Sequence, residues 1–294
     1  MPRTITVGID GTDHSLAAAD WAAAEAARRG AALRLVHAWV WRPLDVPIAT
    51  DADVQRKWAQ DVLTEGEHRV KAAHPELEVA TRLLPDDPMP ALVTEAVEAD
   101  MLVLGSRGHG TLVGHLIGST ALRVLRATTA PVVLVRRPRP RDAGRVVDGA
   151  GEVVVGVPDV TDGSVAPALE FAFEAAAARG ARVRAVQAWT IPPAFAWSAG
   201  SYYLAAEAGG LEELQRQRLA DAMRPWRERY PRVEVTEHVE LGSAAEALLS
   251  QSESASLLVI GRHATGGHGV RRVGSVAHAA LHHAPCPVAV VPHA

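Results

Sequence analysis

The chain has 294 residues, of which 48% are hydrophobic and 22% charged, with a formal net charge of −4. This composition argues against a disordered chain and gives no strongly basic surface for nucleic acid. The single cysteine, Cys286, excludes an intrachain disulfide and a Cys-rich zinc site. The apolar runs are too short for a membrane-spanning helix of about 20 residues, and the N-terminus lacks signal-peptide architecture, so we expect a cytoplasmic protein with no membrane partner.

The first half alternates short apolar segments with helical ones. We expect strands over residues 5–9, 33–40, 79–84, 101–104 and 132–135. We expect helices over 16–29, 53–73 and from 87 to about 99, with a further helix after Gly118. The first helix is rich in alanine and ends at Gly30, a typical C-cap residue. Because aromatic residues make up only 4% of the chain, the core should be aliphatic.

The second half repeats the first. Residues 27–40 and 177–190 match at an offset of 150, and Gly118-Ser119 matches Gly274-Ser275 at an offset of 156. We expect strands over 153–157, 183–189, 233–240, 257–260 and 288–291, and helices over 165–179, 211–230 and 244–254, the last with a capping box from Ser243 to Glu246. A period of this length indicates a duplicated domain. We therefore predict domains at 1–137 and 152–294, joined by a Pro- and Arg-rich linker at 138–151.

The order of these segments predicts the fold class. Continuous apolar strands that alternate with helices indicate a parallel sheet covered on both faces. Right-handed crossovers make each half a doubly wound α/β sandwich. In such folds a ligand binds beyond the carboxyl ends of the strands, at the point where the strand order reverses. The loops that follow the strands are therefore the place to look for a site.

A glycine-rich loop follows the fourth strand of the first half. It has the pattern Gly105-x2-Gly108-x9-Gly118-Ser119, followed by Thr120. Small residues allow close approach to the backbone, and the start of the next helix supplies N–H groups and a positive dipole end, which together suit a phosphate. A turn followed by an ordinary capped helix would have the same composition. The recurrence of the spacing in the second half favours the functional interpretation.

This loop resembles the nucleotide-binding signature of the ATP-binding universal stress proteins. The resemblance covers both halves and implies two Rossmann-like (HUP-type) domains in tandem, related by pseudo-two-fold symmetry. It implies binding of ATP, with Mg²⁺ as a possible companion, a regulatory role in stress response, and dimerisation of the tandem chain. In the first half it implies that Asp10 lies near the adenine and ribose, that the backbone of Ala38 meets the adenine edge, and that Gly105 packs near the ribose. Gly108, Gly118, Ser119 and Thr120 would then hold the phosphates.

The second half departs from this signature. Ala264 stands where the second glycine belongs, and alanine disfavours a positive φ by about 1 kcal/mol. Pro158 aligns with Asp10, so Asp159 would serve only after a shift of one residue. The remaining candidate binding residues of this half are Ala188, Gly261, Gly274, Ser275 and Val276. We expect weaker or altered nucleotide binding here.

Other functional classes have little support. A Walker A loop and a Gly-x-Ser-x-Gly elbow are both absent, so ATP is expected to be a ligand with at most slow hydrolysis. The alternatives are a slow ATPase or nucleotide transferase and a nucleotide-independent scaffold of the same fold. The spacing of His278 and His282 could hold a metal, but we interpret it as a solvated helix face and expect no metal site and no catalytic residue. We expect an unidentified regulatory protein partner and no nucleic acid.

Overall fold

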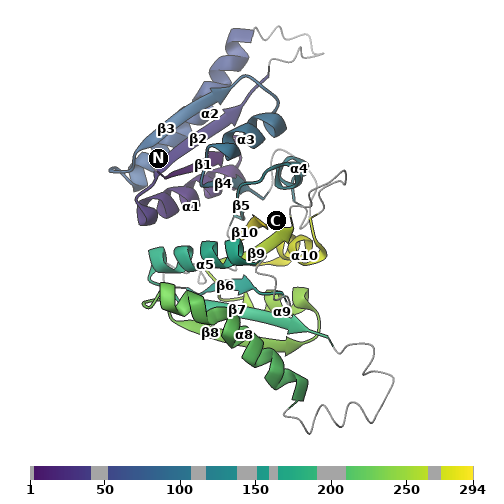
Figure 1. Ribbon diagram of the computed structural model, residues 1–294. Helices are drawn as coiled ribbons and strands as arrows, with labels where there is room; N and C mark the ends of the chain where they lie inside the picture. Colours follow the sequence, from purple (N-terminus) through teal and green to yellow (C-terminus); the bar gives the residue numbers. More distant parts are fainter. Residues whose placement is uncertain are drawn as a thin grey trace. The chain divides into compact units, whose positions relative to one another are not determined.

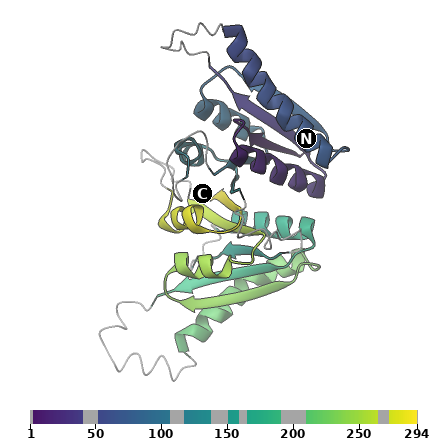
Figure 2. The same ribbon diagram turned by 180° about the vertical axis from the view of Figure 1, so that it is seen from behind.

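The computed structural model describes residues 3–40, 52–106, 117–137, 151–158, 165–190, 210–263 and 273–293. It divides into two compact units, the first taking in residues 1–143 and the second residues 144–268 and 274–294. In each unit a parallel sheet carries helices on both faces (Figures 1 and 2). The predicted linker lies almost entirely outside the described residues.

The first unit has the predicted alternation of strands and helices. Its elements are β1 (Thr4–Gly8), α1 (Asp13–Arg29), β2 (Ala32–Ala38), α2 (Ala52–Ala73), β3 (Val79–Leu84), α3 (Pro88–Val97), β4 (Met101–Gly105), α4 (Ser119–Ala127) and β5 (Val132–Val135). The strands lie in the order β3-β2-β1-β4-β5 and every neighbouring pair is parallel. Because β1 lies between β2 and β4, the strand order reverses beside β1.

The second unit has the same topology. Its elements are β6 (Val153–Gly156), α5 (Ala166–Arg179), β7 (Val183–Trp189), α8 (Gly210–Arg229), β8 (Val235–Leu241), α9 (Ala244–Gln251), β9 (Leu257–His263), α10 (Ser275–His283) and β10 (Val288–His293). Its strands lie in the order β8-β7-β6-β9-β10, again all parallel. The predicted duplication of a doubly wound α/β fold is confirmed.

Helices cover the two faces of each sheet in the same pairs. In the first unit α1 and α2 share one face, while α3 and α4 share the other; in the second, α5 and α8 lie opposite α9 and α10. The alanines of α1 make close packing possible, since Ala18, Ala22 and Ala26 are fully buried. The predicted C-cap is confirmed, because Gly30 has a left-handed φ of 59° and donates its N–H to the carbonyls of Ala26 and Ala27. Within the described residues, no helix combines the length and apolar character needed to span a membrane.

Several element boundaries differ from those expected. Helix α1 begins three residues early, because Thr12 acts as its N-cap and accepts a hydrogen bond from the Ser15 N–H. Strand β9 continues to His263 because residues 261–263 pair with 291–293 of β10. The capping box at Ser243 is wrong in its chemistry: Ser243 is the N-cap of α9, but its side chain makes no capping hydrogen bond. Residue type thus predicted the cap position without predicting the hydroxyl rotamer.

Candidate functional site

Asp10 follows β1 and organises the turn that starts α1. Its Oδ1 accepts hydrogen bonds from the Thr12 hydroxyl (2.6 Å) and the Thr12 N–H (3.1 Å), and its own N–H donates to Ser15 Oγ (3.2 Å). The Ser15 hydroxyl in turn donates to the Thr12 carbonyl at 2.9 Å. Asp10 is half-buried at the carboxyl edge of the sheet, where the sequence placed it. The carboxylate is held in one orientation by these contacts.

The end of β2 is tied to the end of β1. Ring atom Nδ1 of His37 lies 2.7 Å from the Ile9 carbonyl oxygen. A carbonyl oxygen only accepts, so Nδ1 must carry the proton and donate. The Ile9 N–H also donates to the Val36 carbonyl, at 2.9 Å. Ala38 is the last residue of β2 and therefore lies beside the segment that carries Asp10.

Gly105 lies directly under the first turn of α1. A Cβ atom at this position would be 2.8 Å from the carbonyl carbon and oxygen of His14 and 2.9 Å from the Ser15 nitrogen. Backbone atoms cannot yield as a side chain does, so only glycine fits here. We expected a ligand to approach the backbone of Gly105 closely. In the structure the backbone of α1 makes that close approach. The same packing brings β4 against the turn that contains Asp10.

The ends of the glycine-rich loop meet at the end of β4. The Ser106 N–H donates to the Val135 carbonyl at 2.8 Å, and the Gly118 N–H donates to the Ser106 carbonyl at 3.0 Å. These bonds place the start of α4 beside β4, with Gly118 as the N-cap residue and no side-chain cap. Ser119 is exposed and Thr120 half-buried. The first turn of α4 therefore presents its N–H groups at the same sheet edge as Gly105.

The described candidate residues of the first unit all lie at the carboxyl edge of its sheet, while three candidates, Gly108, Asp159 and Ala264, lie outside the described residues. It also adds residues that the sequence reasoning did not assign, namely Thr12 and Ser15, which hold Asp10. Part of their signal was available, because threonine is a favoured N-cap residue at a helix start.

The second unit has a different carboxyl edge. Gly261 lies inside the β9–β10 ladder, opposite Val291, rather than at the strand end. A Cβ there would be 3.0 Å from His293 Cδ2 and 3.1 Å from Nε2, so an imidazole occupies the space beside it. Helix α5 is described from Ala166, with Val165 as an N-cap that makes no side-chain hydrogen bond. Ala188 lies near the end of β7, as Ala38 does in β2.

The start of α10 matches that of α4. Gly274 is the N-cap, its φ is −58°, and it lacks a side-chain cap. Among the described residues, no atom lies within 4 Å of where a Cβ on Gly274 would be. Ser275 is exposed, and Val276 stands where the first unit has Thr120. The second unit thus keeps the backbone donors but has one hydroxyl fewer.

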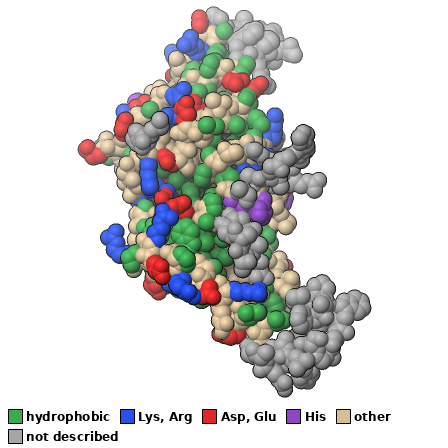
Figure 3. Space-filling view, viewed as in Figure 1, with side chains coloured by type: hydrophobic (Ala, Val, Ile, Leu, Met, Phe, Trp, Pro, Cys, Tyr) green, Lys and Arg blue, Asp and Glu red, His purple; other side chains and the backbone are tan. Residues whose placement is uncertain are grey.

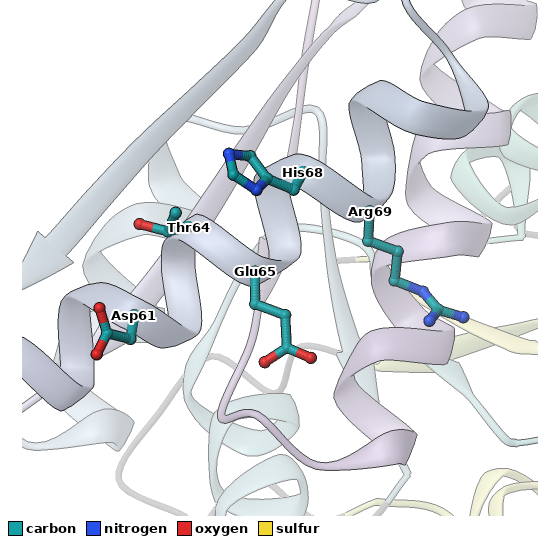
Figure 4. A pocket seen from close by; sticks show the side chains of 5 residues that line it. All are labelled: Asp61, Thr64, Glu65, His68 and Arg69. Carbon is teal, nitrogen blue, oxygen red and sulfur yellow. The ribbon is translucent and has the colours of Figure 1, made fainter.

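A separate surface pocket lies along α2. On the face shown in Figure 3, basic and acidic side chains are interspersed. The pocket has a volume of about 640 Å³ and is lined by Asp61, Thr64, Glu65, His68 and Arg69, all on α2 (Figure 4). Arg69 donates two hydrogen bonds of 2.7 Å to Asp20, and this partner raises the pKa of Arg69 above its ordinary value. None of the predicted binding residues lines this pocket, and no group of three or more metal-ligating side chains occurs in the described part of the chain.

Comparison with known proteins identifies the family. The family model described as "Universal stress protein family" matches residues 1–136 and 152–292. Universal stress protein Rv2005c of Mycobacterium tuberculosis is 32% identical, over 97% of this chain and 96% of the relative. A universal stress protein from Archaeoglobus fulgidus has the same fold, with a TM-score of 0.70 at 18% identity over 99% of this chain and 98% of that one. A universal stress protein crystallised in complex with cAMP is 32% identical over 45% of this chain and 96% of its own, with a TM-score of 0.37. The chain belongs to the universal stress protein family and carries two of its domains in tandem.

Proposed function

We propose that this chain is a regulatory universal stress protein that binds ATP at the carboxyl edge of the first unit. The observation that carries the proposal is the hydrogen bond from the Gly118 N–H to the Ser106 carbonyl, which holds the uncapped start of α4 against the end of β4. A helix start of this kind attracts anions through its N–H groups and its dipole. Asp10, on the same edge, supplies a carboxylate in a fixed orientation, which can accept a hydrogen bond from an uncharged donor.

Each described residue has a definite part in this proposal. Asp10 accepts a hydrogen bond from the adenosine moiety, and the backbone of Ala38 meets the adenine edge. Because Gly105 has no side chain, it does not obstruct the site beside the end of β4. The N–H groups and hydroxyls at Ser119 and Thr120 bind the phosphates, with Gly118 leading into them and Gly108 in the loop between. Where Mg²⁺ accompanies ATP, the phosphates bind it.

The second unit is proposed to bind the same ligand class more weakly. Gly274 and Ser275 provide the helix start, Val276 contributes no hydroxyl, and Ala188 and Gly261 take the positions of Ala38 and Gly105. Asp159 and Ala264 are proposed contacts in the adjoining loops.

Substitution of Gly118 tests the proposal. The φ of −58° and ψ of 139° at Gly118 suit any residue, and Asp is a favoured N-cap, so Gly118→Asp should fold. Its carboxylate would occupy the phosphate position and repel the ligand. Calorimetry with ATP should show a loss of at least tenfold in affinity at the first unit, while the isosteric but neutral Gly118→Asn loses less. Equal affinity in wild type and Gly118→Asp would contradict the proposal.

Two further measurements separate the proposal from its rivals. Native mass spectrometry of the purified chain should detect bound adenine nucleotide, and its absence, together with no binding in calorimetry, would favour a nucleotide-independent scaffold. ATP turnover above background that disappears in Gly118→Asp would instead favour a slow ATPase or nucleotide transferase.

Assembly and cell location also belong to the proposal. We propose a homodimer of the tandem chain that works in the cytoplasm and engages a regulatory protein partner, on the basis of the family resemblance. Sedimentation equilibrium with and without ATP would test the dimer. A mass equal to one chain at all concentrations would remove it.

A further inference from the structure

Two histidines end the neighbouring strands β9 and β10 of the second unit. His263 and His293 are register partners in the parallel ladder, and their ring centroids are 4.2 Å apart with 65° between the ring planes. His263 is exposed, whereas His293 is only 7% exposed. The ring of His293 lies beside Gly261, with Nε2 3.1 Å from where a Cβ would be. The pair therefore lies at the carboxyl edge where this unit's ligand is proposed to bind.

The first unit has arginine at both equivalent positions. The offset of 156 that relates Gly105 to Gly261 also relates Arg107 to His263 (107 + 156 = 263) and Arg137 to His293 (137 + 156 = 293). Arg137 forms an ion pair with Asp13 at the start of α1, and Arg107 lies outside the described residues. In the second half two imidazoles end these strands, whereas the sequence of the first half has arginine at both equivalent positions. Of these side chains, only the imidazoles can lose their charge near neutral pH.

The described elements packed against the pair carry few charged groups. Helix α5 covers this face, and its first four residues, 166–169, are neutral. Its first carboxylate, Glu170, is paired with Arg229 of α8. Adjacent strand residues point to opposite faces, so Arg262 points away from His263, toward the face that α10 covers. The helix histidines His278, His282 and His283 belong to that second face, where Figure 3 shows histidine side chains gathered near α10.

We propose that His263 and His293 form a proton-dependent contact for the phosphate of the ligand in the second unit. This inference rests on the proposed nucleotide binding. A protonated imidazole donates a charge-assisted hydrogen bond to a phosphate oxygen, and the uncapped start of α10 provides the backbone donors of the same unit. The second unit therefore binds its ligand tightly only when the pair carries a proton.

Proton binding and phosphate binding are linked at this pair. A phosphate favours the protonated form of an imidazole that donates to it, so binding draws in a proton and the affinity falls as pH rises. The first unit, with arginines at these positions, lacks this dependence. The two units then differ in how their affinity for the same ligand depends on pH.

Calorimetry on the full chain can isolate this effect. We choose cAMP as the main probe, since its phosphodiester keeps one negative charge across the range, and ATP as a second probe. The Gly118→Asp substitution weakens binding at the first unit by at least tenfold and leaves the second unit unchanged. The affinity of the second unit for cAMP should fall by about tenfold between about pH 5.5 and about pH 8, the worth of a hydrogen bond to a charged group. Titration in buffers of different ionisation enthalpy should show proton uptake on binding.

Substitutions assign the dependence to the pair. His263→Gln should reduce the pH dependence, because only His293 then remains to donate from a protonated ring, and this exposed side chain can be replaced without harm to folding. His293→Gln should do the same if the buried site tolerates it. His283→Gln, at the far end of α10, is the matched control and should keep the wild-type slope.

The possible failures are distinguishable. An unchanged slope in His263→Gln, a pH-independent affinity in the second unit, or binding confined to the first unit would overturn the histidine contact alone. Absence of cAMP and ATP binding from the wild-type chain at every pH would overturn the proposed function and this inference with it.

Discussion

The two units neutralise an equivalent arginine in different ways. In the first unit, Arg34 of β2 pairs with the buried Glu95 of α3 at 3.1 Å. In the second, Arg184 of β7 pairs with Glu152, the residue before β6, at 2.7 Å. The position of Glu95 is then taken by Gln251 (95 + 156 = 251), whose Oε1 accepts from Arg184 at 2.6 Å.

This difference shows that the fold requires a partner for the arginine but does not require the carboxylate to lie at one fixed position. The carboxylate has moved from a helix to the start of a strand, while the arginine has stayed. A half-buried guanidinium needs a charge partner and satisfied donors, and either element can supply them. The same freedom separates the two carboxyl edges, where helix backbone fills the space beside Gly105 and an imidazole fills the space beside Gly261.

The two edge glycines should respond very differently to alanine. Gly105→Ala forces a methyl group against the backbone of α1 at 2.8 Å, so it should lower the free energy of unfolding of the first unit by about 3 kcal/mol. Gly261→Ala makes its tight contacts with the His293 side chain, which can shift, and only an ordinary contact with Ala168, so it should cost about 1 kcal/mol or less. Hydrogen exchange of the strand amides, read by mass spectrometry, would report each unit separately. Equal costs would show that α1 is free to move away from β4.

The relocated carboxylate allows a second comparison. Glu152 also pairs with Arg182, so Glu152→Gln should destabilise the second unit by about 2 kcal/mol, the worth of hydrogen bonds to a charged group. Adding Gln251→Glu rebuilds the arrangement of the first unit and should recover about half of that loss. Denaturant unfolding of the two single variants and the double variant gives the coupling free energy directly. Strictly additive effects on the free energy of unfolding would mean that Arg184 does not couple Glu152 to Gln251.

Much of the fold could be predicted because its signals are local. Strands β3, β5 and β7 have the predicted bounds, since runs such as Val132–Val135 are apolar and lie between polar or Pro-containing segments. The duplication was predicted from the motif spacing. The position of the candidate residues at the carboxyl edge was predicted from the topology of parallel sheets. Gly118 was expected at a helix start, and it is the N-cap of α4.

The details that escaped prediction depend on contacts between distant segments. The reason for Gly105 is the backbone of α1, some ninety residues earlier in the chain, and no local pattern announces that contact. The continuation of β9 to His263 depends on its pairing with the last residues of β10. The interpretation of the C-terminal histidines covered only His278 and His282 of the last helix, and nothing local pointed to His263 and His293, which end neighbouring strands and face each other. Only the 156-residue offset from two arginines could have revealed that pair.

The smallest effect we predict concerns two helix caps that look alike in the sequence. Thr12 accepts the Ser15 N–H at 3.3 Å and also donates to Asp10, whereas the Ser243 side chain makes no capping bond. Thr12→Ala should therefore cost about 1 kcal/mol, and Ser243→Ala less than about 0.5 kcal/mol. Denaturant titration of the two variants beside wild type measures the difference. Since Thr12 also orients Asp10, Thr12→Ala should weaken ATP binding at the first unit as well, and a loss of stability without any loss of affinity would separate the cap from the proposed site.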